Sequence, residues 1–432
     1  MNPLVLLIVS FFVLIALRVN IGFSLILSSI AVILYEDLPL ASVVNQMYSN
    51  IDSFPLMAVP FFMFLGRILN AGSITDRLLR VADATVGHIR GGLGHVNVFV
   101  SMVFASLSGS AAADTASVGS VLIPSMKKAG YDPAFAVALT AASSTLGVII
   151  PPSIILIIYG AFGNVSIGAL FIGGIVPGLT IGVFMMGYTY VEALRQGYPA
   201  NTFPGFKAAG NAVLKGLASL IIPVFVLGGI IGGIVTPTEA AILAVSWALI
   251  LTFIVYRDVP ISKFPRLLSE AAVDFAVPLF TVAGAGIFGW LISYFGAAEL
   301  VVKTITSVTA DPIGIMLLLV VFLLLIGTVL NPISAVLIFL PIIQALGNLA
   351  DVNPVHLGVL TTIVLSVGLI TPPYGICLLI AAQIGDVTIG RAVVAVLPIV
   401  LISILVAIIS LWLPDIVIGL PKLAMPAAFG IN

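Results

Sequence analysis

Apolar segments that follow one another with short connections dominate this sequence and constrain its fold most. Ten candidate membrane-spanning helices can be placed, at residues 3–17, 22–35, 54–72, 133–158, 167–191, 216–235, 239–256, 271–292, 355–382 and 391–413. A helical crossing needs about 20 apolar residues, so the 432 residues leave no room for a sizeable domain outside the membrane. We therefore predict an all-α polytopic membrane protein with about ten transmembrane helices.

Charge and residue usage exclude several classes of function. Only 8% of the residues are charged, against roughly 25% in soluble domains, which excludes a soluble enzyme. The net charge of −1 argues against a nucleic-acid partner. Cys377 is the single cysteine, and His88, His95 and His356 fit no metal-ligand spacing, so we expect no disulfide, no cofactor and no transition-metal site. No Walker A motif occurs, which argues against an ATP-driven pump.

Two further apolar stretches, residues 97–125 and 312–349, are interrupted by small polar residues and predict re-entrant hairpins. The distribution of Lys and Arg tests this topology, because these residues concentrate in cytoplasmic loops. With two hairpins, 13 basic residues lie inside and only Lys303 and Lys422 lie outside; with two single crossings, six lie inside and nine outside. The hairpin topology is therefore favoured, and it places both termini on the outer, periplasmic side.

The two halves of the chain resemble each other at an offset of 217 to 221 residues. The matched pairs are Pro60 and Pro278, Ser110 and Gly327, Asp114 and Asn331, Pro124 and Pro341, Gly147 and Gly368, and Pro151-Pro152 and Pro372-Pro373. Each half, residues 1–215 and 216–432, contains five predicted spans and one hairpin. Because five is odd, the second half must insert upside down, which is the inverted-topology repeat of secondary transporters.

A mildly amphipathic segment precedes the hairpin in each half, at residues 73–89 and 296–308. In the first segment, apolar residues such as Ile74 and Leu78 stand among charged residues such as Asp76 and Arg80. A helix of this kind lies along the membrane surface instead of crossing it. An ordinary polar loop is the alternative.

Four breaks in the apolar pattern mark a candidate transport site. They are the two hairpin tips and two Gly-x-x-x-Pro-Pro segments, residues 147–152 and 368–373. Two successive prolines unwind a helix, and unpaired backbone groups persist at membrane depth only beside protein or a watery cavity. Carbonyls at helix ends suit a hard cation such as sodium, whereas helix N-termini suit an anion. The breaks therefore predict cation-coupled transport of a carboxylate.

Three of the charged residues in or next to apolar segments are candidates for a functional role. Asp114 stands in the first hairpin, where a carboxylate is costly and usually functional; we predict a role at the ion site or in fixing the tip, with capping of the next helix as the alternative. Glu239 follows Thr236 and suits a first-turn acid of a helix as well as it suits a functional residue. Arg67 lies near the cytoplasmic end of its span, where we predict snorkelling.

Four motifs in chain order carry a resemblance to a known family. They are SGSAAAD at 108–114, GVIIPPS at 147–153, TPTEAA at 236–241 and GLITPP at 368–373. Across essentially its whole length the sequence resembles the large membrane subunit of a TRAP (tripartite ATP-independent periplasmic) transporter. The resemblance implies a sodium-driven importer of organic acids, with sialic acid favoured over C4-dicarboxylates on overall likeness alone. It also implies an elevator mechanism, in which hairpins and broken helices form a transport domain that moves against a scaffold.

The resemblance further implies which residues bind the ions and the substrate. For sodium these are Ser108, Ser110, Asp114, Thr145, Gly147 and Pro151 in the first half, and Thr328, Asn331, Gly368, Thr371 and Pro372 in the second. The substrate is expected between the two tips, near Ser110, Thr115, Ser153, Asn331, Pro332, Ser334 and Tyr374. Because Asn331 stands where the first tip has Asp114, the two ion sites need not be equal in charge or affinity.

Partners and location follow from the same resemblance. We expect a small four-helix membrane subunit, a periplasmic substrate-binding protein and residence in the bacterial inner membrane. The first span begins close to Met1, so the small subunit is expected to be a separate chain. Two other functions remain as alternatives: a stand-alone sodium/dicarboxylate or citrate-type symporter that needs no binding protein, and a channel or membrane scaffold without coupled transport.

Overall fold

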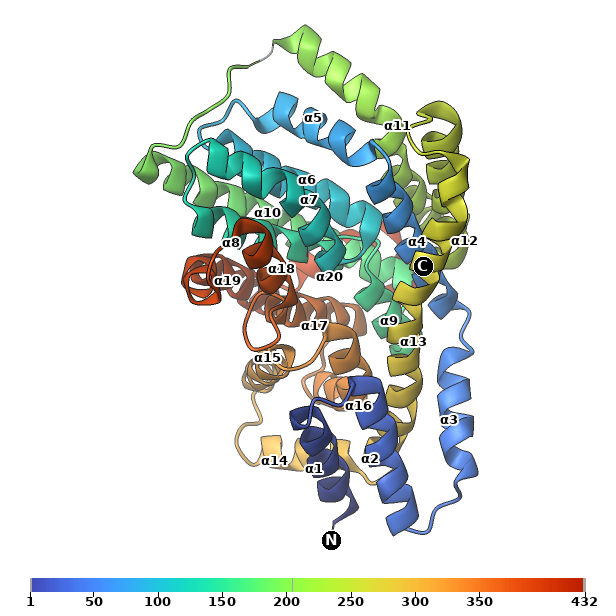
Figure 1. Ribbon diagram of the computed structural model, residues 1–432. Helices are drawn as coiled ribbons and strands as arrows, with labels where there is room; N and C mark the ends of the chain where they lie inside the picture. Colours follow the sequence, from blue (N-terminus) through green and yellow to red (C-terminus); the bar gives the residue numbers. More distant parts are fainter. Residues whose placement is uncertain (1, 204, 430–432) are drawn as a thin grey trace.

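The structure is a computed structural model that describes residues 2–203 and 205–429, and all regular structure in this part of the chain is helical (Figure 1). The helices of the first half are α1 (Pro3–Ala16), α2 (Ile21–Tyr35), α3 (Ala41–Ile51), α4 (Ala58–Ala71), α5 (Ile74–Val86), α6 (Gly92–Ser108), α7 (Ala111–Lys128), α8 (Pro133–Ser144), α9 (Ile154–Gly163) and α10 (Ile167–Gln196). Those of the second half are α11 (Phe206–Ile231), α12 (Pro237–Leu249), α13 (Phe264–Tyr294), α14 (Ala297–Thr306), α15 (Pro312–Gly327), α16 (Pro332–Leu349), α17 (Pro354–Gly368), α18 (Ile376–Gly385), α19 (Ile389–Trp412) and α20 (Asp415–Ala424). Short 3-10 and π segments are η1 (Pro55–Met57), η2 (Thr145–Val148), η3 (Ile250–Val255), η4 (Ile261–Lys263) and η5 (Pro426–Phe429).

Many of these helices are apolar enough to lie within a membrane. Five are long enough to cross it, and the number rises to seven if each of two bent helix pairs forms one span. Eight further apolar helices in the described part of the chain have 10 to 17 residues, among them both parts of each broken segment. The prediction of an all-helical polytopic membrane protein is thereby confirmed. The number of crossings, the inverted repeat and the sidedness stay predictions.

Local sequence explains where many helices begin. Asn2, Asp132, Asp311, Asn331 and Asn353 each accept a backbone N–H from the first turn of the following helix through the side chain. Each is followed by proline, whose missing N–H is not needed in the first turn and whose fixed φ favours the helix. The recurring Asx-Pro pair therefore marks five helix starts.

Two helix pairs stand where the sequence predicts hairpins. The first is α6 and α7, which are joined at Gly109, a residue with a left-handed φ of 63° that favours glycine. The second is α15 and α16, which are joined by residues 328–331. Re-entry of these pairs from one side of the membrane stays a prediction.

The helices are interrupted at both Gly-x-x-x-Pro-Pro segments. In the first half, α8 tightens into η2, and irregular residues 149–153 separate it from α9. In the second half, α17 ends at Gly368, and residues 369–375 separate it from α18. The proline pairs predicted both interruptions correctly.

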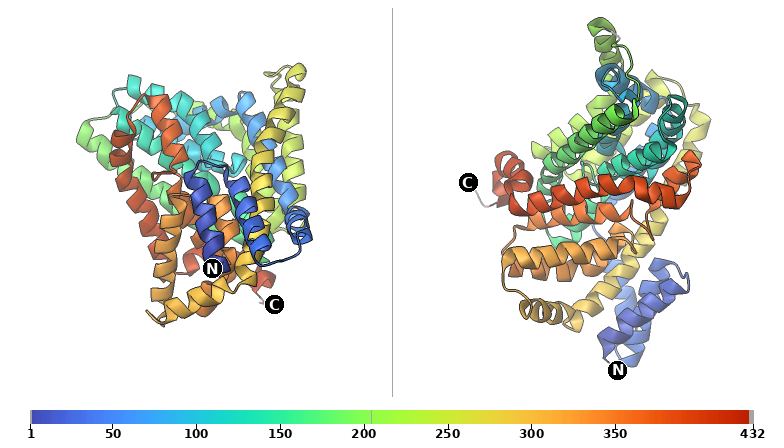
Figure 2. Two further views of the ribbon diagram at one scale, coloured as in Figure 1. Left: turned by 60° about the horizontal axis from the view of Figure 1, so that its bottom comes forward. Right: turned by 90° about the vertical axis from the view of Figure 1, so that its left-hand side faces the viewer.

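Helices from the two halves of the chain pack into one bundle around these interruptions. The second-half helix α18 packs against α7 and α8 of the first half, and α16 packs against α9. On the opposite side, α13 runs next to α2, α3 and α4 (Figures 1 and 2). The hairpins and the broken helices thus lie against α13 and its neighbours. The division into a mobile transport domain and a scaffold stays a prediction.

Three details of the fold bear on the sequence predictions. Both amphipathic segments form helices, α5 and α14, and not the loops that were the alternative. The helix α3 was not predicted, because Asn45, Gln46 and Asn50 interrupt its apolar pattern; it packs against α13 and meets α4 at a bend of 63°. The helix α20 was not predicted either, and it packs against α10.

Candidate functional site

The tip of the first hairpin is organised around the side chains of Ser108, Ser110 and Asp114. The Ser108 hydroxyl donates a hydrogen bond to Asp114 Oδ1 at 2.5 Å and accepts one from the Ser110 backbone N–H at 3.2 Å. The Ser110 hydroxyl oxygen accepts the Ala113 N–H at 3.5 Å and caps α7. The turn and the carboxylate are therefore fixed to each other by side chains of the SGSAAAD motif.

The second oxygen of Asp114 is left without a partner. The side chain is fully buried, and Oδ2 has no hydrogen bond within the described part of the chain. A Cβ placed on Gly147 would lie 2.6 Å from this oxygen, so Oδ2 faces the backbone of η2 directly. A buried carboxylate oxygen without a partner is strongly unfavourable unless a proton or a cation satisfies it.

The first break lies against the same hairpin tip. A Cβ on Gly109 would lie 2.9 Å from the Pro152 carbonyl oxygen, so the tip and the proline pair are in contact. The Ser153 hydroxyl donates to the Val148 carbonyl at 2.5 Å and also caps α9. Residues 145–153 are all buried. The structure therefore brings Asp114, Gly147 and the proline pair together, as predicted for one site.

The side chains of Thr145 and Thr115 are engaged elsewhere. The Thr145 hydroxyl donates to the Ala142 carbonyl at 2.7 Å, and the Thr115 hydroxyl donates to the Ala111 carbonyl at 2.8 Å. Thr115 also makes a side-chain hydrogen bond with the buried thiol of Cys377 on α18. Cys377 thus brings the second half of the chain into contact with Thr115 of α7.

The second tip and the second break are joined by Asn331 and Tyr374. The Tyr374 backbone N–H donates to the Thr328 carbonyl at 2.8 Å, and Asn331 Nδ2 donates to the Tyr374 hydroxyl at 3.0 Å. Asn331 Oδ1 accepts the Ile333 N–H at 2.9 Å. Unlike Asp114, Asn331 therefore uses both polar atoms of its side chain within the protein.

The remaining residues predicted for the second ion site are less enclosed than those of the first. The hydroxyls of Thr328 and Thr371 donate to carbonyls of their own helices, at 2.7 and 2.8 Å. A Cβ on Gly368 would overlap the Gly327 carbonyl oxygen, so α15 and α17 touch there. Pro372 is exposed, whereas its counterpart Pro151 is buried. Nearly identical motifs thus have different surroundings in the two halves.

A small cavity of about 150 Å³ lies at the second tip. Asn331, Ser334 and Tyr374 line it together with Asn20, which caps α2, and Thr281 from α13. Three residues predicted to bind substrate are therefore neighbours. Pro332, the fourth second-half residue predicted to bind substrate, is buried in the first turn of α16, and the first-half residues of that prediction, Ser110, Thr115 and Ser153, do not line this cavity.

A larger cavity of about 540 Å³ lies at the first tip, between α7 and the helices α4 and α13. Ser108 and Ser110 line it from the hairpin, and Arg67 lines it from α4. Arg67 pairs with two acids of α13, and the snorkelling of its head group stays a prediction. Its Nε donates to Asp274 Oδ2 at 2.5 Å, and its Nη1 lies 3.6 Å from Glu270 Oε2.

This group of charges was not predicted from the sequence. Asp274 lies in a predicted span, and an acid in one span together with a base in another was a signal for an ion pair. Glu239, by contrast, has the structural role that was considered: its Oε2 accepts the Thr236 N–H at 2.7 Å, and the two residues form a capping box.

The all-helical fold is similar to that of a solved transporter structure. The structure superposes with a TM-score of 0.61 on the crystal structure of the YdaH transporter of Alcanivorax borkumensis, with 17% identity and 88% of each chain covered. At this identity the likeness shows the fold alone.

Sequence comparison identifies the family. The pattern of the tripartite ATP-independent periplasmic transporter, DctM component, matches residues 8–416. The chain is 35% identical to the sialic acid TRAP transporter large permease protein SiaM of Vibrio cholerae, over 92% of this chain and 95% of that protein. It is 32% identical to the C4-dicarboxylate TRAP transporter large permease protein DctM of Pseudomonas aeruginosa, over 91% and 92%. The chain belongs to the DctM family of TRAP transporter large permeases, and the resemblance noted in its motifs is confirmed.

Proposed function

We propose that this chain imports an organic acid by coupling its movement to sodium. The observation that carries the proposal is the fully buried Asp114, whose Oδ2 is unpaired and faces the backbone of η2. A monovalent cation at this oxygen would neutralise the carboxylate, and hard oxygen donors are the ligands that sodium prefers. Ser108 holds the other carboxylate oxygen in place. Glycine at position 147 lets the backbone of η2 approach Asp114 Oδ2, because a larger residue would occupy the space in front of this oxygen.

The proposed substrate site lies between the two hairpin tips. The helix α7 begins at the first tip and α16 begins at the second, and a helix N-terminus stabilises a carboxylate through its free N–H groups and its dipole. Asn331, Ser334 and Tyr374 add polar side chains. Sialic acid and C4-dicarboxylates are named for the relatives above, and we propose sialic acid as the first substrate to test.

The proposal includes the partners and the movement expected for a TRAP permease. A periplasmic binding protein delivers the acid, and a separate small membrane subunit extends the scaffold in the bacterial inner membrane. The hairpins and broken helices move as one body against α13 and its neighbours, in an elevator movement. The hairpins and broken helices of the two halves pack against one another, which supports their movement as one body.

Uptake by proteoliposomes tests the proposal. The permease, with its small subunit and binding protein, is assayed over a panel of sialic acid and dicarboxylates with and without a sodium gradient. We expect uptake to need both sodium and the binding protein. Asp114→Asn should strongly weaken the sodium activation that arises at the first site, whereas Asp311→Asn, which removes an exposed acid but keeps a capping side chain, should not. Unchanged sodium activation in Asp114→Asn would refute the ion site, and uptake without binding protein would favour the stand-alone symporter.

A further inference from the structure

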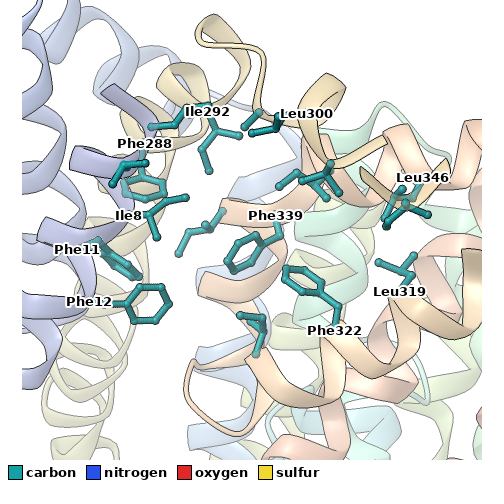
Figure 3. A pocket seen from close by; sticks show the side chains of 18 of the residues that line it. Ile8, Phe11, Phe12, Phe288, Ile292, Leu300, Leu319, Phe322, Phe339 and Leu346 are labelled. Carbon is teal, nitrogen blue, oxygen red and sulfur yellow. The ribbon is translucent and has the colours of Figure 1, made fainter. Parts of the chain in front are cut away.

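An apolar pocket separates the second hairpin from α1, α13 and α14. It has a volume of about 410 Å³ and is lined almost only by carbon (Figure 3). Phe322 and Phe339 come from the hairpin, whereas Ile8, Phe11 and Phe288 come from the opposite wall. None of the residues predicted for ions or substrate lines this pocket.

The pocket opens on the outer apolar surface of the molecule. Val5, Ile8, Phe12 and Leu300 line it and are nevertheless 39 to 56% exposed. In a membrane protein this surface faces hydrocarbon. An unfilled space of this size would forfeit the dispersion contacts of its walls, so a group that fits will enter from the bilayer.

The pocket continues into a polar mouth on α14. Asn2, Leu4 and Leu300 line both the apolar pocket and the neighbouring depression, which also contains Glu299 and Lys303. Glu299 and Lys303 are four residues apart on one helix and therefore lie on the same face. The mouth thus presents one anion and one cation within one turn of each other.

We propose that this pocket binds a zwitterionic phospholipid, with one acyl chain in the apolar part and the headgroup at α14. The phosphate would meet Lys303 and the ammonium group would meet Glu299, so both headgroup charges have a partner. A helix of a partner protein fits poorly: one helical turn, about 5.4 Å long and 10–12 Å wide, would use the whole volume. A volume of this size suits a single small-molecule-sized group.

A lipid acyl chain bound in this pocket would affect transport, an effect that rests on the proposed function. The acyl chain would lie between the second hairpin on one side and α1 and α13 on the other. Movement of the hairpin must therefore displace or rearrange the acyl chain. The lipid would then influence the rate of the elevator movement. Lipid binding itself is measured without transport, so it is testable even if the proposed sodium coupling fails.

Native mass spectrometry of the full chain in detergent tests the site with phosphatidylethanolamine as the probe. The headgroup variant is Lys303→Gln, with Lys422→Gln as its control, because Lys422 is on α20 and does not line this pocket. The pocket-filling variant is Ile8→Trp, with Val9→Trp as its control, because Val9 is exposed on α1 but is not a pocket residue. Leu300→Trp fills the pocket from the opposite wall and replaces Ile8→Trp if that variant does not fold.

We expect one retained phosphatidylethanolamine per wild-type chain. Lys303→Gln should bind it about fivefold more weakly, since a basic residue contributes on the order of 1 kcal/mol to phospholipid headgroup attraction. The filling variants should lose it, and both controls should keep it. Equal retention by Ile8→Trp and Val9→Trp, or equal affinity for phosphatidylglycerol and phosphatidylethanolamine, would overturn the proposal.

Discussion

Replacing Gly147 by alanine tests the first ion site at the point where its geometry is tightest. The new Cβ would lie 2.6 Å from Asp114 Oδ2 and 3.5 Å from the Ala111 nitrogen, so either the carboxylate or η2 must move. The added methyl group would occupy the space in which the proposed cation meets Oδ2. Gly147 is in a helical turn, where alanine is otherwise the more favourable residue by up to about 1 kcal/mol. A general loss of helix stability is therefore not expected.

The size of the effect follows from overpacking. Insertion of one group into a well-packed interior costs about 1–3 kcal/mol, and the cation-bound state carries this penalty because it needs Oδ2 in place. The sodium concentration for half-maximal uptake should therefore rise roughly 5- to 150-fold. The maximal uptake rate at saturating sodium should change by a smaller factor than the sodium concentration for half-maximal uptake.

The matched control is Gly66→Ala, on the other side of the same tip. There a Cβ would lie 3.6 Å from the Ser108 Cβ, an ordinary van der Waals contact. The assay is initial uptake in proteoliposomes over a range of sodium concentrations, with the melting temperature of each variant measured in parallel. If Gly147→Ala and Gly66→Ala show the same sodium dependence, the assignment of Oδ2 as a cation ligand is refuted.

Three further substitutions separate the roles of other residues. Arg67→Gln should lower the melting temperature little, since the ion pair with Asp274 is a third or more exposed and such pairs contribute below about 1 kcal/mol, but it should reduce uptake if the first cavity lies on the substrate path. Thr236→Ala should destabilise the protein by about 1 kcal/mol through the lost cap, without changing the sodium dependence of uptake. Tyr374→Phe should raise the substrate KM roughly 2- to 12-fold by removing the bond to Asn331, with sodium activation at the first site unchanged.

The sequence predicted those parts of the fold that depend on local chemistry. The interruptions at 147–152 and 368–373 follow from successive prolines, as predicted. The Asx-Pro pairs at five helix starts were not used as a prediction, although they carry a signal of the same local kind. Asp114 was identified because an acid among small residues in an apolar stretch is unusual. In each case the relevant interactions lie within a few residues of one another, so the sequence alone contains the signal.

The features that the sequence did not predict depend on contacts between distant segments. Arg67 and Asp274 are 207 residues apart, and only the packing of α4 against α13 brings them together. Cys377 reaches Thr115 because α18 packs against α7. The proline pairs have matching sequences, yet the first is buried and the second exposed, because different helices cover them. No local pattern encodes which of two similar motifs will be covered.

This asymmetry leads to a prediction about coupling between sodium and substrate. The first proposed site has a carboxylate, Asp114, that neutralises a bound cation. The cavity at the second tip is lined by Asn331, Ser334, Tyr374 and other uncharged residues, so a cation bound beside it has no protein anion among those residues. The carboxylate of the substrate would then neutralise this cation. Substrate and cation should therefore strengthen each other's binding.

Reciprocity makes this coupling measurable in the wild-type protein. If substrate raises sodium affinity by a given factor, sodium must raise substrate affinity by the same factor, and couplings of this kind are typically 5- to 150-fold. Equilibrium binding of substrate at several sodium concentrations gives one factor, and sodium binding with and without substrate gives the other. Asp114→Asn should weaken only the part of sodium binding that does not depend on substrate, because the second cation is neutralised by the substrate and not by Asp114. Sodium binding that is the same with and without substrate would show that the second tip holds no cation that depends on the acid for its charge.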